Sequence, residues 1–238
     1  MLDDWQKIII LTLLAGLAMP FGALLANVES FCGKRLQDEV RHSVVAFGGG
    51  ALLSAVALVL IPKGIETLDL LSIILSFGLG GILIGCISKY LSKSGSKASN
   101  FIAMLTDFVP EALALGTSVA MGEEALAVLL AIMIGLQNLP EGFSTYRDLI
   151  DSDWKGNHII YSLTIVALLG PISGLLGFYV LVDYPQLIAA MMLFSSGGIL
   201  FLVFQDIIPE SQLECSSKPA IATSLGFLLG LVGHVLSH

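Results

Sequence analysis

Charged residues are scarce in this sequence: they make up 13% of its 238 residues, against about 25% in an average soluble domain. A soluble core of this length needs a charged surface around it, and too few charged residues are available to form one. Basic residues are also outnumbered, with 11 Lys and Arg against 19 Asp and Glu, which excludes nucleic-acid binding as a main role. The hydrophobic content of 55% therefore predicts an integral membrane protein surrounded by the lipid bilayer.

Cysteine pairs and common catalytic motifs are absent as well. Cys32, Cys86 and Cys215 form no CxxC pair and no even set, so we expect no structural disulfide. The sequence contains no HExxH and no GxSxG motif. We therefore predict that the protein is not an enzyme.

Long hydrophobic runs, by contrast, are abundant. Crossing a bilayer takes about 20 residues, and eight runs approach or exceed that length, which is too long for barrel strands. Because backbone groups in lipid must be satisfied within the segment, the runs predict an all-α fold with eight transmembrane helices in one domain, residues 1–238. The expected helices are 8–28, 43–62, 70–88, 99–122, 125–146, 158–182, 184–207 and 219–237.

Positive charge is distributed unevenly between the connections of these helices. Nine of the 11 Lys and Arg residues fall in the first, third, fifth and seventh connections, and only Lys7 and Lys63 lie on the other side. Cytoplasmic loops are enriched in Lys and Arg, so the side with nine is expected to be cytoplasmic. Both termini would then lie outside the plasma (inner) membrane.

Two pairs of segments resemble each other. FGGGALLSAVALVLIP, from Phe47, and FSSGGILFLVFQDIIP, from Phe194, match at six positions without gaps, and PFGALLA, from Pro20, resembles PISGLLG, from Pro171. The members of each pair run in opposite directions in the predicted topology. This predicts a 3+2+3 inverted repeat, with three helices on either side of a central pair. The alternative is that glycine-rich helices use similar packing surfaces.

Acidic residues occur inside the fourth and fifth predicted helices. The fourth contains Asp107-Phe-Val-Pro-Glu111 and the fifth contains Gln137-Asn-Leu-Pro-Glu141, so in each a polar residue and a Glu share one helical face. The proline before each Glu removes a backbone donor and frees a carbonyl four residues earlier, which predicts a kink.

These carboxylates require compensation within the membrane. A carboxylate at the centre of a transmembrane helix costs about 2.5 to 3.5 kcal/mol on insertion scales, and no Lys or Arg lies inside any predicted span. A divalent cation compensates two charges and uses oxygen ligands directly. We therefore expect a cation site; the alternative is that protonated carboxyls hydrogen-bond across the helices.

The two motifs resemble the paired HNxPEG and HxxPEG signatures of the ZIP metal-ion transporters. Gln137–Gly142 is the most specific segment, Asp107–Glu111 is a looser copy, and Phe194–Glu210 resembles the seventh helix of the family. The resemblance covers nearly the whole chain and implies a 3+2+3 fold with both termini outside. It implies movement of zinc, iron, manganese or cadmium into the cytoplasm by alternating access, in which the helix 4/5 unit slides against helices 2 and 7 as an elevator.

The same resemblance implies the ligands of the metal. The first metal position corresponds to Asp107, Glu111, Gln137 and Glu141, and Asn138 matches a residue that helps to build a second site in some members. Imidazole suits zinc, whereas carboxylate and amide oxygens suit harder ions. Since no His is present at these positions, we expect selectivity to shift from zinc toward manganese and ferrous iron. The metal ion is the substrate, and no organic cofactor is implied.

Departures from the family pattern concern the second metal site. Phe108 stands where the family has Asn, and Gly170 precedes the proline of the sixth helix, where the family can have a Glu. These departures imply one bound metal ion rather than two.

Four further residues are candidates for a metal route. Asp206 and Glu210 stand four apart at the end of the seventh helix, where they form either an exit station or a solvated helix end. Met104 and Met133 lie about one turn before the polar residues of the two motifs, either as ligands for softer ions or as packing residues.

Two other functions stay open on the sequence alone. An intramembrane metallo-enzyme would use the same cluster to activate water, although no spare acid is available as a general base. A metal-responsive membrane protein would keep the site without transporting. The partners implied are divalent metal ions and lipid; homodimers occur in the family, and the sequence leaves the oligomeric state open.

Overall fold

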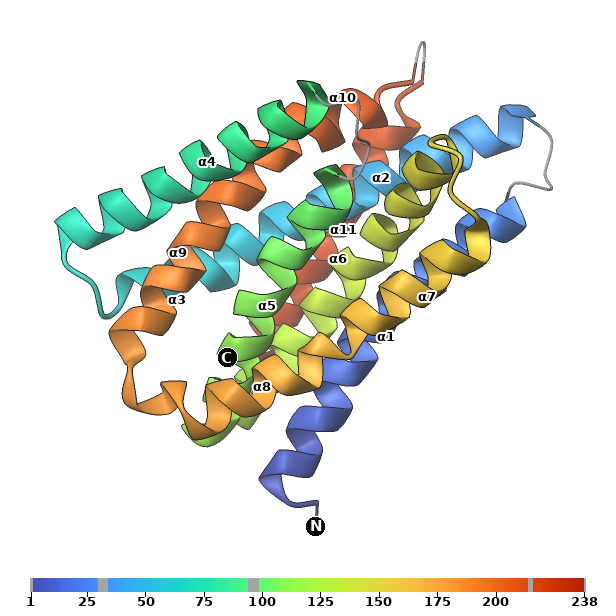
Figure 1. Ribbon diagram of the computed structural model, residues 1–238. Helices are drawn as coiled ribbons and strands as arrows, with labels where there is room; N and C mark the ends of the chain where they lie inside the picture. The colour runs from blue at the N-terminus through green and yellow to red at the C-terminus, as the bar shows by residue number, and fades with distance from the viewer. Residues whose placement is uncertain (1, 30–33, 94–98, 214–215, 238) are drawn as a thin grey trace.

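The computed structural model describes residues 2–29, 34–93, 99–213 and 216–237, which are helical nearly throughout and contain no strand (Figure 1). The side chains of 29, 34–37, 91–93, 99–103, 106, 107 and 237 are outside this description. Cys32 and Cys215 also lie outside it, and Cys86 is a free, exposed thiol. The predicted all-α class is confirmed.

The described residues form eight long helical passages. They are α1 (Asp4–Glu29); α2 (Lys34–Ala55), continued by the π-helical segment η1 (Val56–Leu60) and by α3 (Ile61–Ile65); α4 (Leu70–Lys93); α5 (Ser99–Ala120); α6 (Glu124–Ile150); α7 (Gly156–Ala167) with α8 (Leu169–Tyr179); α9 (Pro185–Leu202), continued by the π-helical segment η3 (Val203–Ile207) and by α10 (Ile208–Ser211); and α11 (Lys218–Ser237). A short 3-10 turn, η2 (Leu181–Asp183), precedes α9. Over the described residues seven passages are long and apolar enough to span a bilayer, and α5 adds the shorter apolar stretch Phe108–Ala120. The prediction of an eight-helix membrane protein is confirmed.

Successive passages run in opposite directions, so the connections alternate between two ends of the molecule (Figure 1). The first, third, fifth and seventh connections share one end, which we call the basic end because it carries most of the Lys and Arg residues. At the opposite end, the Lys7 ammonium binds Glu124 at 2.5 Å and the Lys63 ammonium binds Glu123 at 3.2 Å. Both basic residues of that end therefore pair with the acidic turn between α5 and α6.

The outermost helices present apolar side chains to the surroundings. Only 11% of the apolar window of α4 and 17% of that of α11 is buried, against 67% for the α2–α3 passage. Exposed leucine and isoleucine on α4 and α11 would be unfavourable in water. In hydrocarbon they form the lipid-facing surface.

The two π-helical segments occupy equivalent positions of the sequence repeat. η1 begins at Val56 and η3 at Val203, which are aligned residues. In each, the N–H of the residue before a proline, Ile61 or Ile208, donates to the carbonyl of that valine, five residues earlier. The proline has no N–H and disturbs the regular helical pattern, which favours this wider turn. A shared irregularity at aligned positions supports a true repeat rather than chance similarity.

Four helix pairs pack with their backbones in contact at reciprocal glycines. Each glycine faces a backbone carbonyl oxygen of its partner helix, and a methyl group in its place would overlap with that oxygen. Lipid supplies no hydrophobic force between helices, so close packing of small residues is what holds such pairs together. The pairs are α1 with α6 (Gly22, Gly142), α5 with α8 (Gly116, Gly177), α2 with α11 (Gly50, Gly226) and α4 with α9 (Gly80, Gly197).

These contacts divide the passages into two bundles. The first bundle contains α1, α5, α6, α7 and α8, and the second contains α2–α3, α4, α9–α10 and α11. In the repeat, the first three passages correspond to the last three, and α5 corresponds to α6. The α1–α6 pair therefore corresponds to the α8–α5 pair, and the α2–α11 pair corresponds to the α9–α4 pair. The bundles meet mainly where α6 packs on α2 and α5 packs on α9.

The contact glycines of α1 and α8 stand at different distances from the prolines matched in sequence. Gly22 follows Pro20 directly after Phe21, whereas Gly177 follows Pro171 by about one turn more. The physical difference is that α1 continues through Pro20, whereas the sixth passage is interrupted between α7 and α8, shortly before Pro171.

We predict that Gly80→Ala destabilises the protein and that Gly78→Ala, on the same helix, does not. A methyl group at Gly80 would overlap with the carbonyl oxygen of Phe194, whereas nothing lies within 4 Å of one at Gly78. Overpacking costs about 1–3 kcal/mol, so only Gly80→Ala should lower the melting temperature of the purified protein in detergent. Equal melting temperatures for the two variants would contradict this packing.

Candidate metal site

A carboxyl–amide pair is buried in the first bundle. Glu111 on α5 and Gln137 on α6 are 2% and 1% exposed. The Gln137 Nε2 donates to both carboxyl oxygens of Glu111, at 2.6 and 2.5 Å. The Gln137 Oε1 is buried and has no hydrogen-bond partner among the described residues. One amide oxygen beside the acid is therefore available to a cation.

Both helices of this pair continue through their prolines. α5 includes Pro110 and α6 includes Pro140 without interruption. The helical register therefore places Glu141 one turn beyond Gln137, toward the basic end.

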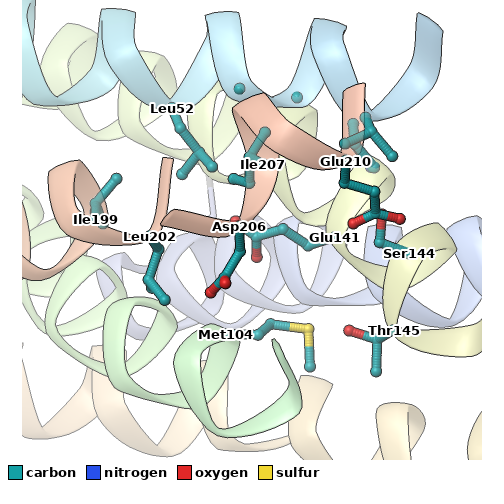
Figure 2. Close-up of a pocket in the computed structure, with 14 residues that line it drawn as sticks. Leu52, Met104, Glu141, Ser144, Thr145, Ile199, Leu202, Asp206, Ile207 and Glu210 are labelled. Atoms are coloured by element: carbon teal, nitrogen blue, oxygen red, sulfur yellow. The ribbon is translucent and has the colours of Figure 1, made fainter. Parts of the chain in front are cut away.

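A cavity between the two bundles lies next to Glu141 (Figure 2). The cavity has a volume of about 50 Å³, whereas one water molecule needs roughly 10–15 Å³. The cavity can therefore hold an ion with a few waters. It is lined by Val45, Gly48, Gly49, Leu52, Met104, Pro140, Glu141, Ser144, Thr145, Ile199, Leu202, Asp206, Ile207 and Glu210.

The polar lining of this cavity is made of oxygen atoms, several of which lack a partner. The Glu141 Oε2, Thr145 Oγ1 and Asp206 Oδ2 atoms are buried without a hydrogen-bond partner among the described residues. Figure 2 shows Glu141 and Asp206 in the middle of the cavity, with Glu210 beside Ser144 toward one end. An unsatisfied buried polar group costs about 1–3 kcal/mol. Carboxylate and hydroxyl oxygens without donors form a suitable environment for a hard or borderline cation.

The predicted first-metal residues are placed in two adjoining groups. Glu111 and Gln137 form the buried pair, and Glu141 lines the cavity. The side chain of Asp107 lies outside the described residues, although its backbone belongs to α5. Among the described side chains, no three His, Cys, Asp or Glu residues lie together as a ready-made metal cluster. Amide and hydroxyl oxygens are therefore part of any site formed by the described residues.

Residues of the suggested second metal position are occupied in other ways. The Asn138 Nδ2 donates to the Ala15 carbonyl of α1 at 3.0 Å, so this amide joins two helices. Phe108 is fully buried, and its ring lies against Gly16 of α1 and Gly170 of α8. An aromatic ring thus packs against the glycine that stands where the family can have a Glu.

The route candidates are separated by the structure. Met104, Asp206 and Glu210 line the cavity, whereas Met133 is buried and packs against Gly230 of α11. Thr145 was not identified from the sequence. The signal that could have found it is its spacing, since a residue four positions after Glu141 shares its helical face.

The fold and this cavity define a class: a helical membrane protein with an oxygen-lined cavity between two bundles, each of which contains helices from both halves of the repeat. The family model described as ZIP zinc transporter matches residues 87–237, which is more than half of the chain, and the chain belongs to this family. A comparison with curated proteins gave no match. The resemblance inferred from the two motifs is confirmed. The ZIP family consists of divalent metal-ion transporters rather than enzymes, so metal transport across the lipid bilayer is the function of this chain.

We predict that Gln137→Leu destabilises the protein by about 1–3 kcal/mol, because the Glu111 carboxyl group then stays buried without its donor. The double variant Glu111→Leu/Gln137→Leu removes both partners and should recover most of that loss. Denaturant unfolding of the purified, metal-free protein measures both. A double variant that is destabilised at least as much as Gln137→Leu would contradict the pairing.

Proposed function

We propose that the chain moves a divalent transition-metal ion into the cytoplasm through a site that includes Glu111, Gln137, Glu141 and Asp206. The observation that carries this proposal is the set of buried, unpaired oxygens at Gln137, Glu141 and Asp206 inside a membrane-spanning bundle. A divalent ion satisfies several of these atoms at once, which no single hydrogen-bond donor does. Asp107 and Asn138 stay in the proposal as neighbours of the site, on the strength of the family motif.

The charge distribution supports the proposed orientation of the chain in the membrane. The cavity lies between the halves of α6 and α9–α10 nearest the basic end, which carries nine Lys and Arg residues and is therefore the cytoplasmic side in this proposal. Both termini then lie outside the plasma membrane. In the described conformation the cavity lies nearer to the cytoplasmic side, and at the outer end Lys63 pairs with Glu123.

Alternating access would proceed by movement of one bundle against the other. The reciprocal glycines tie α1 and α8 to the site helices α6 and α5, so the moving unit is the whole first bundle rather than α5 and α6 alone. Where the bundles meet, Gly48 of α2 faces the ring of Pro140 on α6. At this point of the boundary a glycine lies against a proline ring, a smooth contact that suits an elevator-type movement.

The donor set indicates which ions and how many. Carboxylate, amide and hydroxyl oxygens favour manganese and ferrous iron over zinc, because no imidazole is present. One ion per chain is proposed, since Phe108 against Gly170 fills the place of second-site ligands with carbon atoms.

The test is metal uptake into proteoliposomes across Mn²⁺, Fe²⁺, Zn²⁺, Cd²⁺ and Mg²⁺. We expect uptake of Mn²⁺ and Fe²⁺ by the wild type and a loss of at least about tenfold for Glu141→Ala and Glu111→Ala, which corresponds to roughly 1.4 kcal/mol. The matched control is Asp183→Ala, an acid in the turn between α8 and α9, which should transport like the wild type. Unchanged uptake by both glutamate variants would mean that the site lies elsewhere.

A further inference from the structure

Arg41 lies at the end of the cavity nearest the basic end, which we call its mouth, and connects both bundles. The Arg41 Nη2 on α2 lies 2.9 Å from the Glu210 Oε1 on α10 and 4.0 Å from the Asp148 Oδ1 on α6. Glu210 lines the cavity, and Asp148 follows the lining residue Ser144 by one turn. All three charged side chains are 18–26% exposed, so water screens this contact only in part.

Because of Arg41, the net charge of the cavity lining differs between the middle of the cavity and its mouth. Three carboxyl groups line the cavity: Glu141, Asp206 and Glu210. Glu141 and Asp206 each have a buried oxygen without a partner. Glu210, one turn beyond Asp206, is instead paired with Arg41. The carboxylates in the middle are thus left for an ion, while the one at the mouth is neutralised.

We propose that Arg41 is a positioning residue that withholds Glu210 from the metal ion and thereby lets the ion leave the cavity. This inference rests on the proposed function, in which the ion binds at Glu141 and Asp206. Without Arg41, Glu210 becomes a third carboxylate along the path and the positive charge that repels the ion at the mouth is lost. Both changes hold the ion more tightly. Release into the cytoplasm then becomes slower.

The test combines Mn²⁺ binding to the purified protein, followed by electron paramagnetic resonance, with initial rates of Mn²⁺ uptake into proteoliposomes. For Arg41→Gln we expect the dissociation constant and the KM to fall by roughly tenfold, together with a lower maximal rate. Arg41→Met, which keeps the aliphatic stem, should behave in the same way and guards against misfolding of one variant. Arg41→Lys keeps the charge and should stay within about twofold of the wild type.

A double variant assigns the effect to Glu210. In Arg41→Gln/Glu210→Gln the extra carboxylate is absent, so the affinity for Mn²⁺ should return toward that of the wild type. A merely structural tie between helices would lower the melting temperature without tightening Mn²⁺ binding. Unchanged or weaker binding by Arg41→Gln and Arg41→Met, or tight binding that persists in the double variant, would overturn the inference. Wild-type protein that neither binds nor carries Mn²⁺ or any other tested ion would instead contradict the proposed function.

Discussion

Oxygen atoms without hydrogen-bond partners inside a bilayer-spanning bundle are the constraint on which this structure depends. In water, the Glu141 carboxylate or the Gln137 amide would be solvated, but at this depth solvation must come from protein or from a bound ion. Two of the acids have a donor from the protein: the Gln137 amide donates to Glu111, and Arg41 pairs with Glu210. What is left unpaired, between these two contacts, is the group of oxygens that a cation would complete.

The packing of the helices explains how such a site can exist and still move. Reciprocal glycines join the helices within each bundle through close backbone contacts, which do not depend on polar side chains. The boundary between the bundles is different, because the cavity and the Gly48–Pro140 contact lie there. Ion pairs cross that boundary only near its ends in the described part of the chain, through Lys63 with Glu123 and Arg41 with Asp148. Strong packing within bundles and sparse polar contact between them suit a transporter.

Hydrophobic runs predicted the helices because apolar length decides what crosses a membrane, but they could not predict where the helices end. α2 begins at Lys34 and α6 reaches Ile150, since charged residues end an apolar run without ending a helix. This extension also brings Arg41 to Glu210, a contact between two residues that lie just beyond the predicted spans 43–62 and 184–207. Glu111, Gln137 and Glu141 were predicted from the spacing of polar residues within two helices. That Glu141 shares a cavity with Asp206 depends on how two distant helices pack, which spacing does not encode.

Anomalous diffraction from crystals soaked in Cd²⁺ tests the central claim most directly, because it locates the ion independently of transport. We predict one peak per chain, within coordinating distance of the Glu141 Oε2 and Asp206 Oδ2 atoms or of the adjoining Gln137 Oε1. A cavity that stays without a peak while Cd²⁺ binds only at the surface would contradict the account, as would a second peak of equal height beside Phe108.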